Sequence, residues 1–451
     1  MKDKHLISAA IDVGTTTVSA VVLDVTDKRQ LNSYNRPNDS TLVHNTSAHE
    51  QDPARILEIA GELAELMFEC YPDISCLGFT GQMHGILYVD PDGNAVSPLF
   101  TWQDGRGNLV SDSGRSYCDE IAELTGYTVS SGYGLVTHYC NTRRGEYTAP
   151  GLKICSIMDY LAMRFTGSKT PLVHPSNAAS FGFFDVRKGE FDRAALLKAG
   201  IDENVLPAIV SDDSLIGSYR GIPVSAAIGD NQASVFGSVA DEGDSVLVNY
   251  GTGSQMSLIS DKTEVSAPLE VRPYLFGKNL VCGCALCGGS SYAILEGFFR
   301  SYAVSCGMVD ESQYKTMDVL AEAAYDGKKA PLEVKTLFKG RRSDPDLRAS
   351  IVGIGEDNFT PEQMILGTIH GMADELCEMY LSCGERRRLL VASGNAVQKG
   401  RVLRSVLSDK FGMPLFVPAS KEEAATGAAM YAAICSGAAD LTAVKTCIKY
   451  F

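Results

Sequence analysis

The stretch ISAAIDVGTTTVSAVVLD, residues 7–24, has the pattern of a β-hairpin. Small and β-branched apolar residues fill positions 7–12 and again 17–24, which is typical of two buried strands. A tight Gly-Thr turn separates them. Glycine lets backbone N–H groups approach an anion closely, and threonine hydroxyls add donors, so this turn could hold a phosphate group.

The stretch DSVLVNYGTGSQMSLIS, residues 244–260, repeats this scheme. We expect strands over residues 246–250 and 255–260, with a second Gly-Thr turn between them. One such turn is weak evidence because Gly-Thr turns are common in sheets, but two indicate related halves whose turns face a shared cleft. Aligning the turns pairs Asp12 with Asn249, Gly14 with Gly251 and Thr15 with Thr252.

Helices are expected to alternate with the strands. Residues 53–70 carry apolar side chains at helical spacing, and Thr360 and Ser420 each open a capping box. Alternating strands and helices predict an α/β protein. A polar break near Gly243 suggests domains 1–243 and 244–451. Further strands are expected over residues 74–80, 86–89, 224–228 and 389–392.

Composition excludes several function classes. The chain has 451 residues, 45% hydrophobic and 21% charged, which is enough for two or three globular domains. A net charge of -15 argues against nucleic acid and anionic membranes as partners. The start of the sequence and the apolar runs predict neither a signal peptide nor a membrane span, so we expect a cytoplasmic protein.

The 13 cysteines fit reduced thiols better than a disulfide framework. A cluster of three, Cys282, Cys284 and Cys287, invites a zinc interpretation. Its spacing matches no standard pair of zinc knuckles and no fourth ligand lies nearby in the sequence. We therefore expect no zinc site there.

Asp12 ends the first strand directly before the first Gly-Thr turn. A carboxylate beside bound phosphates would repel them unless a cation lies between, so its consistent role is to hold Mg²⁺, directly or through water. The alternative is an aspartate that only forms the turn.

Two further segments combine polar groups suited to a sugar. GQMHG places Gln82, Met83 and His84 in a turn after a strand, where ligands of α/β sheets bind. In TWQDGR, Trp102 offers a flat apolar face and Asp104 offers a hydrogen-bond acceptor, which suits a polyol. The alternatives are a structural histidine and a core tryptophan followed by a solvated turn.

Asp230 lies between apolar segments in AIGDNQASVFGS, residues 227–238. By default an aspartate between a strand and a helix is an N-cap. Beside a bound polyol, the same carboxylate could accept a hydroxyl proton as a phosphoryl group arrives. The two roles are compatible, because a residue at a helix start can still present its side chain to a substrate.

These motifs together resemble the FGGY carbohydrate kinases, in the right order over nearly the whole chain. The resemblance implies an actin-like ATPase fold of two ribonuclease-H-like domains, with a nucleotide and sugar cleft between them that takes ATP and Mg²⁺. The motifs are DVGTT (12–16), TGQMHG (80–85), TWQDGR (101–106), GDNQ (229–232), GTGS (251–254) and SGNA (393–396).

The resemblance also implies roles for single residues. Asp230 would be the catalytic base, Asp12 would lie on the metal side, and Gly14, Thr15 and Thr16 would form the first phosphate turn. Gly251 and Thr252 would cradle the γ-phosphate, and Gly394 and Asn395 would lie against the nucleoside, although many relatives have a longer glycine-rich turn there. The sugar site would contain Gln82, Met83, His84, Trp102, Asp104, Asp230 and Asn231.

The implied reaction is phosphorylation of a terminal hydroxyl of a ketose. SGYG (131–134), NAASFGFFD (177–185) and RPYLFG (272–277) favour the branch of the family that acts on sedoheptulose, with xylulose or another pentulose as the alternative. A more distant alternative is an actin-like ATPase without a sugar acceptor, which would have no reason to carry GQMHG, WQDGR and GDNQ together. The sequence leaves room for a homodimer.

Overall fold

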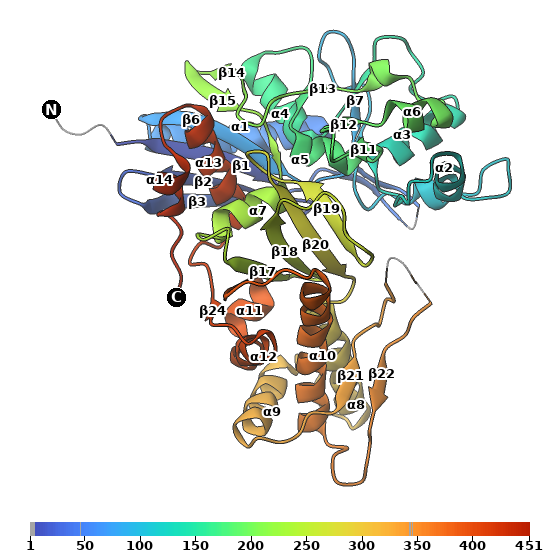
Figure 1. The fold of residues 1–451 in the computed structure, drawn as a ribbon, viewed down its shortest axis with the longest axis vertical. Coiled ribbons are helices and arrows are strands. Elements are labelled where there is room, and N and C mark those ends of the chain that lie inside the picture. Colours follow the sequence, from blue (N-terminus) through green and yellow to red (C-terminus); the bar gives the residue numbers. More distant parts are fainter. Residues whose placement is uncertain (1–4, 46, 342–343, 345) are drawn as a thin grey trace. The chain divides into compact units, whose positions relative to one another are not determined.

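The computed structural model describes residues 5–45, 47–341, 344 and 346–451. The chain forms two compact units (Figure 1). The first combines the described part of Met1–Ala240 with Arg272–Lys278 and Ser420–Lys449. The second consists of Asp241–Val271, the described part of Asn279–Ala419 and Tyr450–Phe451. The chain therefore returns twice to the first unit after leaving it at Ala240.

The first unit is built on a mixed sheet. The hairpin predicted from residues 7–24 is confirmed, with Asp12 opposite Ser19 in an antiparallel pair. On its other side, the first strand of the hairpin pairs in parallel with residues 74–81. In sheet order the strands are β14 (Leu215–Tyr219), β15 (Ile222–Ser225), β6 (Ile74–Gly81), β1 (Ile7–Val13), β2 (Thr17–Asp24) and β3 (Arg29–Pro37), and β16 (Ile228–Gly229) also pairs with β6.

The two faces of β1 carry different partners. Ala9 and Ile11 pack into a core with helices α1 (Pro53–Cys70) and α4 (Ile157–Thr166). On the other face, the Ser8 hydroxyl donates to the Ala429 carbonyl (2.6 Å) in α13 (Glu423–Cys435). Because side chains alternate along a strand, Asp12 lies on the Ser8 face, the face that α13 covers.

Helix α13 can approach closely because it is rich in alanine and has a glycine at position 427. It packs against β1, β6 and α7 (Asp230–Ser238). A Cβ on Gly427 would come within 1.9 Å of the Ala233 carbonyl oxygen in α7, so no larger residue fits there. The start of α13 lies against the end of α7, because a Cβ on Gly237 would come within 2.2 Å of the Glu423 carbonyl oxygen.

The rest of the first unit includes a second apolar core, formed by residues between β6 and α7. Its helices are α2 (Tyr117–Thr125), α3 (Gly134–Arg143), α5 (Pro175–Ala178) and α6 (Arg193–Ala199), and α14 (Leu441–Lys445) follows α13. Its short strands are β4 (Thr41–His44), β5 (His49–Gln51), β7 (Leu87–Val89), β8 (Leu99–Phe100), β9 (Lys153–Cys155), β10 (Leu172–Val173), β11 (Phe184–Asp185), β12 (Glu190–Phe191) and β13 (Ala208–Ile209).

The second unit repeats the strand order of the first. Its central strand pairs with an antiparallel neighbour on one side and a parallel one on the other. This repetition confirms the two related halves predicted from the sequence. In sheet order the strands are β19 (Leu269–Pro273), β20 (Asn279–Ala285), β18 (Ser254–Ser260), β17 (Ser245–Tyr250), β23 (Leu389–Ser393) and β24 (Leu415–Phe416).

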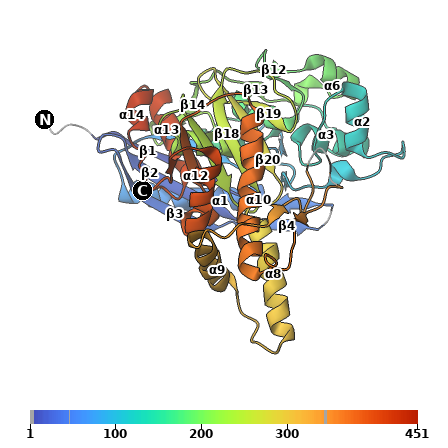
Figure 2. The same cartoon turned by 60° about the horizontal axis from the view of Figure 1, so that its bottom comes forward.

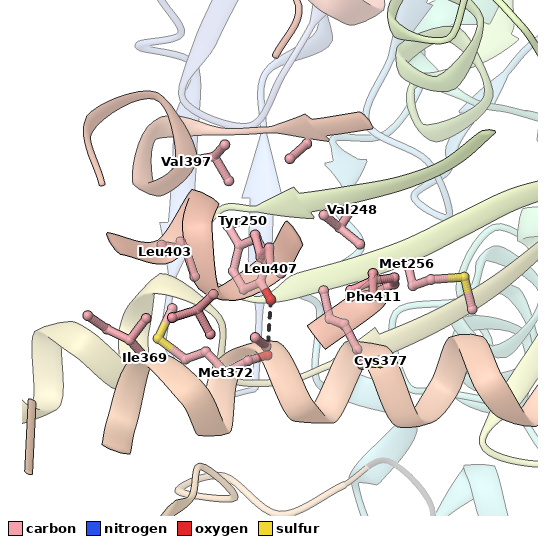
Figure 3. Packing of buried hydrophobic residues seen from close by; sticks show 14 of the residues in the cluster. Val248, Tyr250, Met256, Ile369, Met372, Cys377, Val397, Leu403, Leu407 and Phe411 are labelled. Atoms are coloured by element: carbon pink, nitrogen blue, oxygen red, sulfur yellow. Dashed lines mark hydrogen bonds between the residues drawn. The ribbon is translucent and has the colours of Figure 1, made fainter. Parts of the chain in front are cut away.

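Helices pack against this second sheet. Figure 3 shows Tyr250 of β17 donating its hydroxyl to the Met372 carbonyl (3.0 Å) of α10 (Pro361–Ser382), within a core of buried apolar side chains. Helix α10 contacts α8 (Gly289–Ser305), α9 (Tyr314–Asp326) and α12 (Arg401–Phe411), as Figure 2 shows. The remaining elements are α11 (Asn395–Lys399), β21 (Glu333–Lys335) and β22 (Ser350–Val352).

Three local predictions need correction. The strand expected over residues 224–228 is interrupted, because β15 ends at Ser225 and β16 begins only at Ile228. Thr360 is confirmed as the N-cap of its helix, since its side chain accepts the N–H of Gln363, but the reciprocal bond of a capping box is missing because the Thr360 N–H donates to the Asn358 carbonyl. The capping box at Ser420 is wrong, because that hydroxyl instead contacts Gln30 and Thr426, and α13 starts at Glu423.

All thirteen cysteines lie in the described residues, and none of them forms a disulfide. Within the described residues, Cys282, Cys284 and Cys287 do not form one of the groups of side chains that could hold a metal ion. Among the described helices, none combines the length and apolarity that a membrane crossing requires.

Candidate functional site

Four carboxyl groups gather at the end of β1 in the first unit. Burial, together with the nearby charges of Asp230, Glu422 and Glu423, raises the pKa of Asp12 to about 8. Burial also raises the pKa of Glu423 to about 7, with a contribution from Glu422. Partly buried acids that raise one another's pKa values lower their energy by sharing a proton or a cation.

Asp230 is the first residue of α7 and follows Gly229, which is the N-cap. The interpretation of Asp230 as the N-cap is therefore wrong by one position. Its Oδ1 accepts the N–H of Asn231 (2.7 Å). Burial raises the pKa of Asp230 to about 6, although this hydrogen bond and the charge of Arg272 oppose the rise. A carboxylate with this pKa is ionised at neutral pH and can still accept a proton.

A chain of hydrogen bonds joins the first turn to two predicted sugar-site segments. Trp102 Nε1 donates to Thr15 Oγ1 (3.0 Å), and that hydroxyl donates to Gln82 Oε1 (3.4 Å). Gln82 Nε2 donates to Gln51 Oε1 (2.8 Å), whose own Nε2 donates to the Thr15 carbonyl (2.8 Å). The structure thus brings together Thr15, Gln82 and Trp102, and the tryptophan is 47% exposed.

His84 has a left-handed backbone, with φ of 71°, which is rare for a residue with a side chain and often marks a functional site. Its N–H donates to Ser180 Oγ (3.0 Å), and Nδ1 lies 2.9 Å from the Ser180 carbonyl oxygen, so Nδ1 carries the proton. Its ring stacks on Tyr133, with centroids 4.7 Å apart and planes at 4°. These contacts fix the imidazole in one orientation.

Met83 links this turn to the start of α7. A Cβ on Gly229 would come within 2.7 Å of the Met83 sulfur, so the two backbones are held close by a buried side chain. Asp230 directly follows Gly229. The TGQMHG and GDNQ segments, far apart in the sequence, therefore meet in the first unit.

Asp104 differs from the other predicted sugar-site residues. Its side chain is completely buried, and Arg106 donates to both of its oxygens, with Nε 2.7 Å from Oδ1 and Nη2 3.1 Å from Oδ2. The N–H groups of Arg106 and His49 donate to it as well. These contacts occupy both oxygens, so the geometry favours a structural role for Asp104 in place of the predicted hydroxyl contact.

The first turn also distributes its donors differently from the prediction. The N–H of Gly14 donates to the Thr17 carbonyl (2.9 Å) and so closes the turn itself. Its carbonyl accepts from Asn38 Nδ2 (2.9 Å). Thr15 and Thr16 lie at the tip of the turn, and Thr16 is exposed. The Gly14 N–H is therefore used within the turn, and the Thr15 hydroxyl is used by Gln82 and Trp102.

The second unit contains a pocket of about 680 Å³ beside the second Gly-Thr turn. The carbonyls of Gly251 and Thr252 accept N–H groups from the start of α8, which fixes this turn. Gly394 has φ of 96°, and Asn395 follows it in the pocket wall. The lining includes Gly251, Thr252, Tyr292, Tyr314, Asp318, Met372, Asn395 and Arg401.

Residues that the sequence did not single out contribute to the carboxyl cluster and the His84 turn of the first unit and to the pocket of the second. Glu422 and Glu423 were predicted as part of the capping box opened by Ser420. The pair of acids before a run of small residues instead marks the start of α13, where Glu422 is the N-cap. Tyr133 lay in a segment whose shape could not be predicted. Tyr292 and Asp318, which share a hydrogen bond of 3.0 Å in the pocket, carried no local signal.

Comparison with known families gives two matches that together span most of the chain. Residues 7–237 match the N-terminal domain of the FGGY family of carbohydrate kinases, and residues 246–436 match its C-terminal domain. The sedoheptulokinase of Mus musculus is 26% identical over 94% of this chain and 96% of that protein. The glycerol kinase of Aquifex aeolicus is also 26% identical, over 95% of this chain and 89% of that protein.

Solved structures share the fold. A xylulose kinase from Rhodospirillum rubrum has a TM-score of 0.82 at 20% identity and covers 99% of this chain and 93% of its own. The Plasmodium falciparum glycerol kinase with ADP has a TM-score of 0.79 at 20% identity, covering 98% of this chain and 91% of its own. The α/β fold expected from the sequence is therefore confirmed.

Proposed function

Because this chain belongs to the FGGY family of carbohydrate kinases, we propose that it transfers the γ-phosphate of ATP to a terminal hydroxyl of a ketose, with sedoheptulose as the preferred substrate. The family makes it a phosphotransferase that acts on a sugar. The choice of sedoheptulose is supported by the mouse and human sedoheptulokinases, each 26% identical over 94% of this chain.

The observation that carries the mechanism is the position of Asp230. Its carboxylate starts α7 beside the turn that holds Met83 and His84, and its pKa of about 6 leaves it ionised at neutral pH. We assign it the role of general base. It would take the proton of the sugar hydroxyl as that oxygen attacks the γ-phosphorus, while the bond to the β,γ-bridging oxygen breaks and ADP leaves.

The acidic cluster is proposed to hold a divalent cation together with phosphate oxygens, because its carboxyl groups are not among the described side-chain groups close enough to hold a metal ion by themselves. Asp12, Glu422 and Glu423 are partly buried and act on one another as like charges, and carboxylate oxygens with excess negative charge suit Mg²⁺. Asp12 would hold the ion, directly or through water, with Glu423 nearby. When bound, Mg²⁺ would neutralise charge on the β- and γ-phosphate oxygens.

The residues proposed for the sugar come from the first turn's neighbours, Gln82 and Trp102, from the His84 turn and from the start of α7. Trp102 would present its exposed face to the carbon chain, while Gln82, His84 and Asn231 would hydrogen-bond to hydroxyl groups. Met83 would pack beneath them. Asp104 is proposed only as the partner that holds Arg106 and the Trp102 turn, because its oxygens are already occupied.

The nucleotide residues divide between the two hairpins. Thr15 and Thr16 would donate to phosphate from the first turn, and Gly251 and Thr252 from the second. The pocket of about 680 Å³ beside Thr252 is large enough for a nucleoside, and Asn395 lies in its wall next to Gly394. The cytoplasmic location and the homodimer stay predictions from the sequence.

An ADP-release assay against several acceptors tests the substrate assignment. We expect ATP and Mg²⁺ with sedoheptulose to give a higher kcat/KM than xylulose, ribulose, fructose or glycerol. Preference for xylulose would keep the reaction and replace the substrate. If no acceptor stimulated ADP release, the actin-like ATPase alternative would take the place of the sugar kinase.

A further inference from the structure

A series of hydrogen-bonded side chains, completely buried at Ser176 and His174, lies behind Asp230. None of these side chains has a role in the proposed reaction. The series begins at Gly229, the N-cap of α7, whose N–H donates to Ser176 Oγ (3.2 Å). Ser176 is completely buried. The hydroxyl therefore holds the backbone at the residue directly before the proposed base, without touching the carboxylate itself.

The next member is His174, which is also completely buried. Its Nδ1 accepts the N–H of Ser176 (3.1 Å) and lies 2.7 Å from the Ser176 hydroxyl. Because Nδ1 accepts a backbone N–H, the ring proton must be on Nε2. That nitrogen lies 2.7 Å from Asp212 Oδ1 and donates to it. The chain thus runs from Asp212 through the imidazole to the hydroxyl that holds Gly229.

Asp212 also holds a second segment that supports α7. Its Oδ2 accepts the N–H of Gly277 (2.5 Å), in the Arg272–Lys278 segment of the first unit. Gln232 Nε2 donates a hydrogen bond to the carbonyl of Pro273, in the same segment (2.9 Å). The same nitrogen lies 3.4 Å from the Ser176 carbonyl oxygen. The Asp212 carboxylate is therefore connected to both groups that hold the first turn of α7: through His174 to Ser176, and through Gly277 to the segment that contains Pro273.

The same segment acts on the charge of the base. Arg272 favours the ionised form of Asp230 and opposes the effect of burial on its pKa. Movement of the Arg272–Lys278 segment would therefore change the position of α7 and also the electrostatic field at Asp230, its first residue. The His174–Asp212 pair further contacts α13, because the Tyr431 hydroxyl donates to the Asp212 carbonyl (2.7 Å).

We propose that Asp212, His174 and Ser176 form a positioning relay that fixes the start of α7, and with it Asp230, for proton transfer from the sugar. None of the three is a catalytic residue. The proposal rests on the proposed function, because it assumes that Asp230 is the general base. A buried neutral imidazole between a carboxylate and a hydroxyl can hold such a geometry without changing its own charge.

Ser176→Ala removes the acceptor for the Gly229 N–H while leaving every sugar and nucleotide residue in place. We expect kcat to fall about 10-fold, the lower range for loss of an orienting contact around a reactive group, with KM values for sugar and ATP within about twofold. The matched control is Ser97→Ala. That hydroxyl also accepts a backbone N–H, from Tyr88 (2.8 Å), but belongs to no proposed site.

Two His174 variants separate the halves of the relay. His174→Asn can keep an acceptor for Ser176 but does not reach Asp212, whereas His174→Gln can keep a donor to Asp212 but lacks the acceptor. The relay predicts a lower kcat for both, about 10-fold or more, because each breaks one connection. Thermal unfolding of each variant, compared with Ser97→Ala, separates this effect from general loss of stability.

Hydrogen exchange provides a readout that does not depend on activity. Peptides that cover residues 224–232 should exchange faster in Ser176→Ala than in wild type and Ser97→Ala. Faster exchange together with a lower kcat supports the relay. A folded Ser176→Ala variant with wild-type kcat, or with unchanged exchange in these peptides, overturns it. Wild-type protein that phosphorylates no sugar overturns the proposed function, and the exchange result then still decides whether Ser176 holds Gly229.

Discussion

The two Gly-Thr hairpins have the same backbone plan and different chemistry. Asp12 in β1 pairs in register with Thr80 of β6, and Asn249 in β17 pairs with Ser393 of β23. The next residue of each parallel partner is a glycine. A Cβ would meet the Val13 carbonyl oxygen at 2.8 Å from Gly81, and the Tyr250 carbonyl oxygen at 2.4 Å from Gly394.

What differs is the charge at the strand end. Asn249 is neutral, and its Nδ2 donates to Ser393 Oγ (2.8 Å). Burial of Asp12 raises its pKa, and the neighbouring carboxyl groups add to the rise. One half of the repeat therefore has a neutral strand end and the other an acidic one. Under the proposed function, the neutral end would face the nucleotide, and the acidic end would face the cation and the hydroxyl that loses a proton.

Asp230→Asn should have the largest effect on this division of labour. Loss of the base should lower kcat by about 10² to 10⁴-fold, while sugar binding measured by calorimetry largely survives. Because only the ionised carboxylate accepts a proton, wild-type kcat/KM should fall as pH drops below about 6, its raised pKa. The variant should lack that acidic limb. Turnover close to wild type would remove Asp230 from the mechanism.

Asp12→Asn gives the first hairpin the residue that the second already has. We expect the Mg²⁺ concentration needed for half-maximal activity to rise about 10-fold or more, because the ion loses its charged ligand. An unchanged magnesium titration would contradict the assignment.

The same Asp12→Asn variant has a stability signature without metal. The pKa of Asp12 lies at about 8 in the folded protein against an ordinary 3.8, so between these values only the folded state holds the proton. Wild-type stability therefore loses this contribution as pH rises toward 8. As pH rises over that range, the melting temperature of the variant should increase by several degrees relative to that of wild type. A constant difference in melting temperature would contradict a raised pKa for Asp12.

Asn249→Asp makes the reverse exchange and puts an acid into the second hairpin. Repulsion of phosphate should raise the KM for ATP about 10-fold, equivalent to about 1.4 kcal/mol, and leave the KM for sugar within twofold. Steady-state kinetics with each substrate varied in turn measures both. An effect on sugar alone would break the assignment of this hairpin to nucleotide.

Trp102→Phe should have the smallest effect. It keeps a flat face for the sugar and removes only the Nε1 donor to Thr15, a neutral hydrogen bond worth about 1 kcal/mol. We expect the KM for sugar to rise about threefold with the Mg²⁺ requirement unchanged. A larger rise in the Mg²⁺ requirement would mean that Trp102 supports the first turn more than it supports the sugar.

Local patterns predicted the elements well where one segment contained the whole signal. The hairpin strands β1 and β2 and helix α1 match their predicted ranges to within a residue, because their alternation and spacing are self-contained. The interrupted strand before Gly229 was missed, since its apolar run gives no sign of where pairing with β6 stops and resumes.

The site was harder to predict because its contacts are tertiary. Glu423 meets Asp12 only because the small residues of α13 let that helix lie on β1 and α7. Asp104 was predicted to be a hydrogen-bond acceptor for a polyol, and nothing in the sequence indicated that its carboxylate is buried and paired with Arg106. His174 carries no sequence signal that points to Asp212.

Product analysis tests the central claim most directly. Wild-type protein with ATP, Mg²⁺ and sedoheptulose should give equal amounts of ADP and a sugar phosphate, with the ester on a terminal carbon by phosphorus NMR and little inorganic phosphate. Formation of ADP and inorganic phosphate without a sugar ester would contradict the account, because water and not a sugar hydroxyl would then be the acceptor.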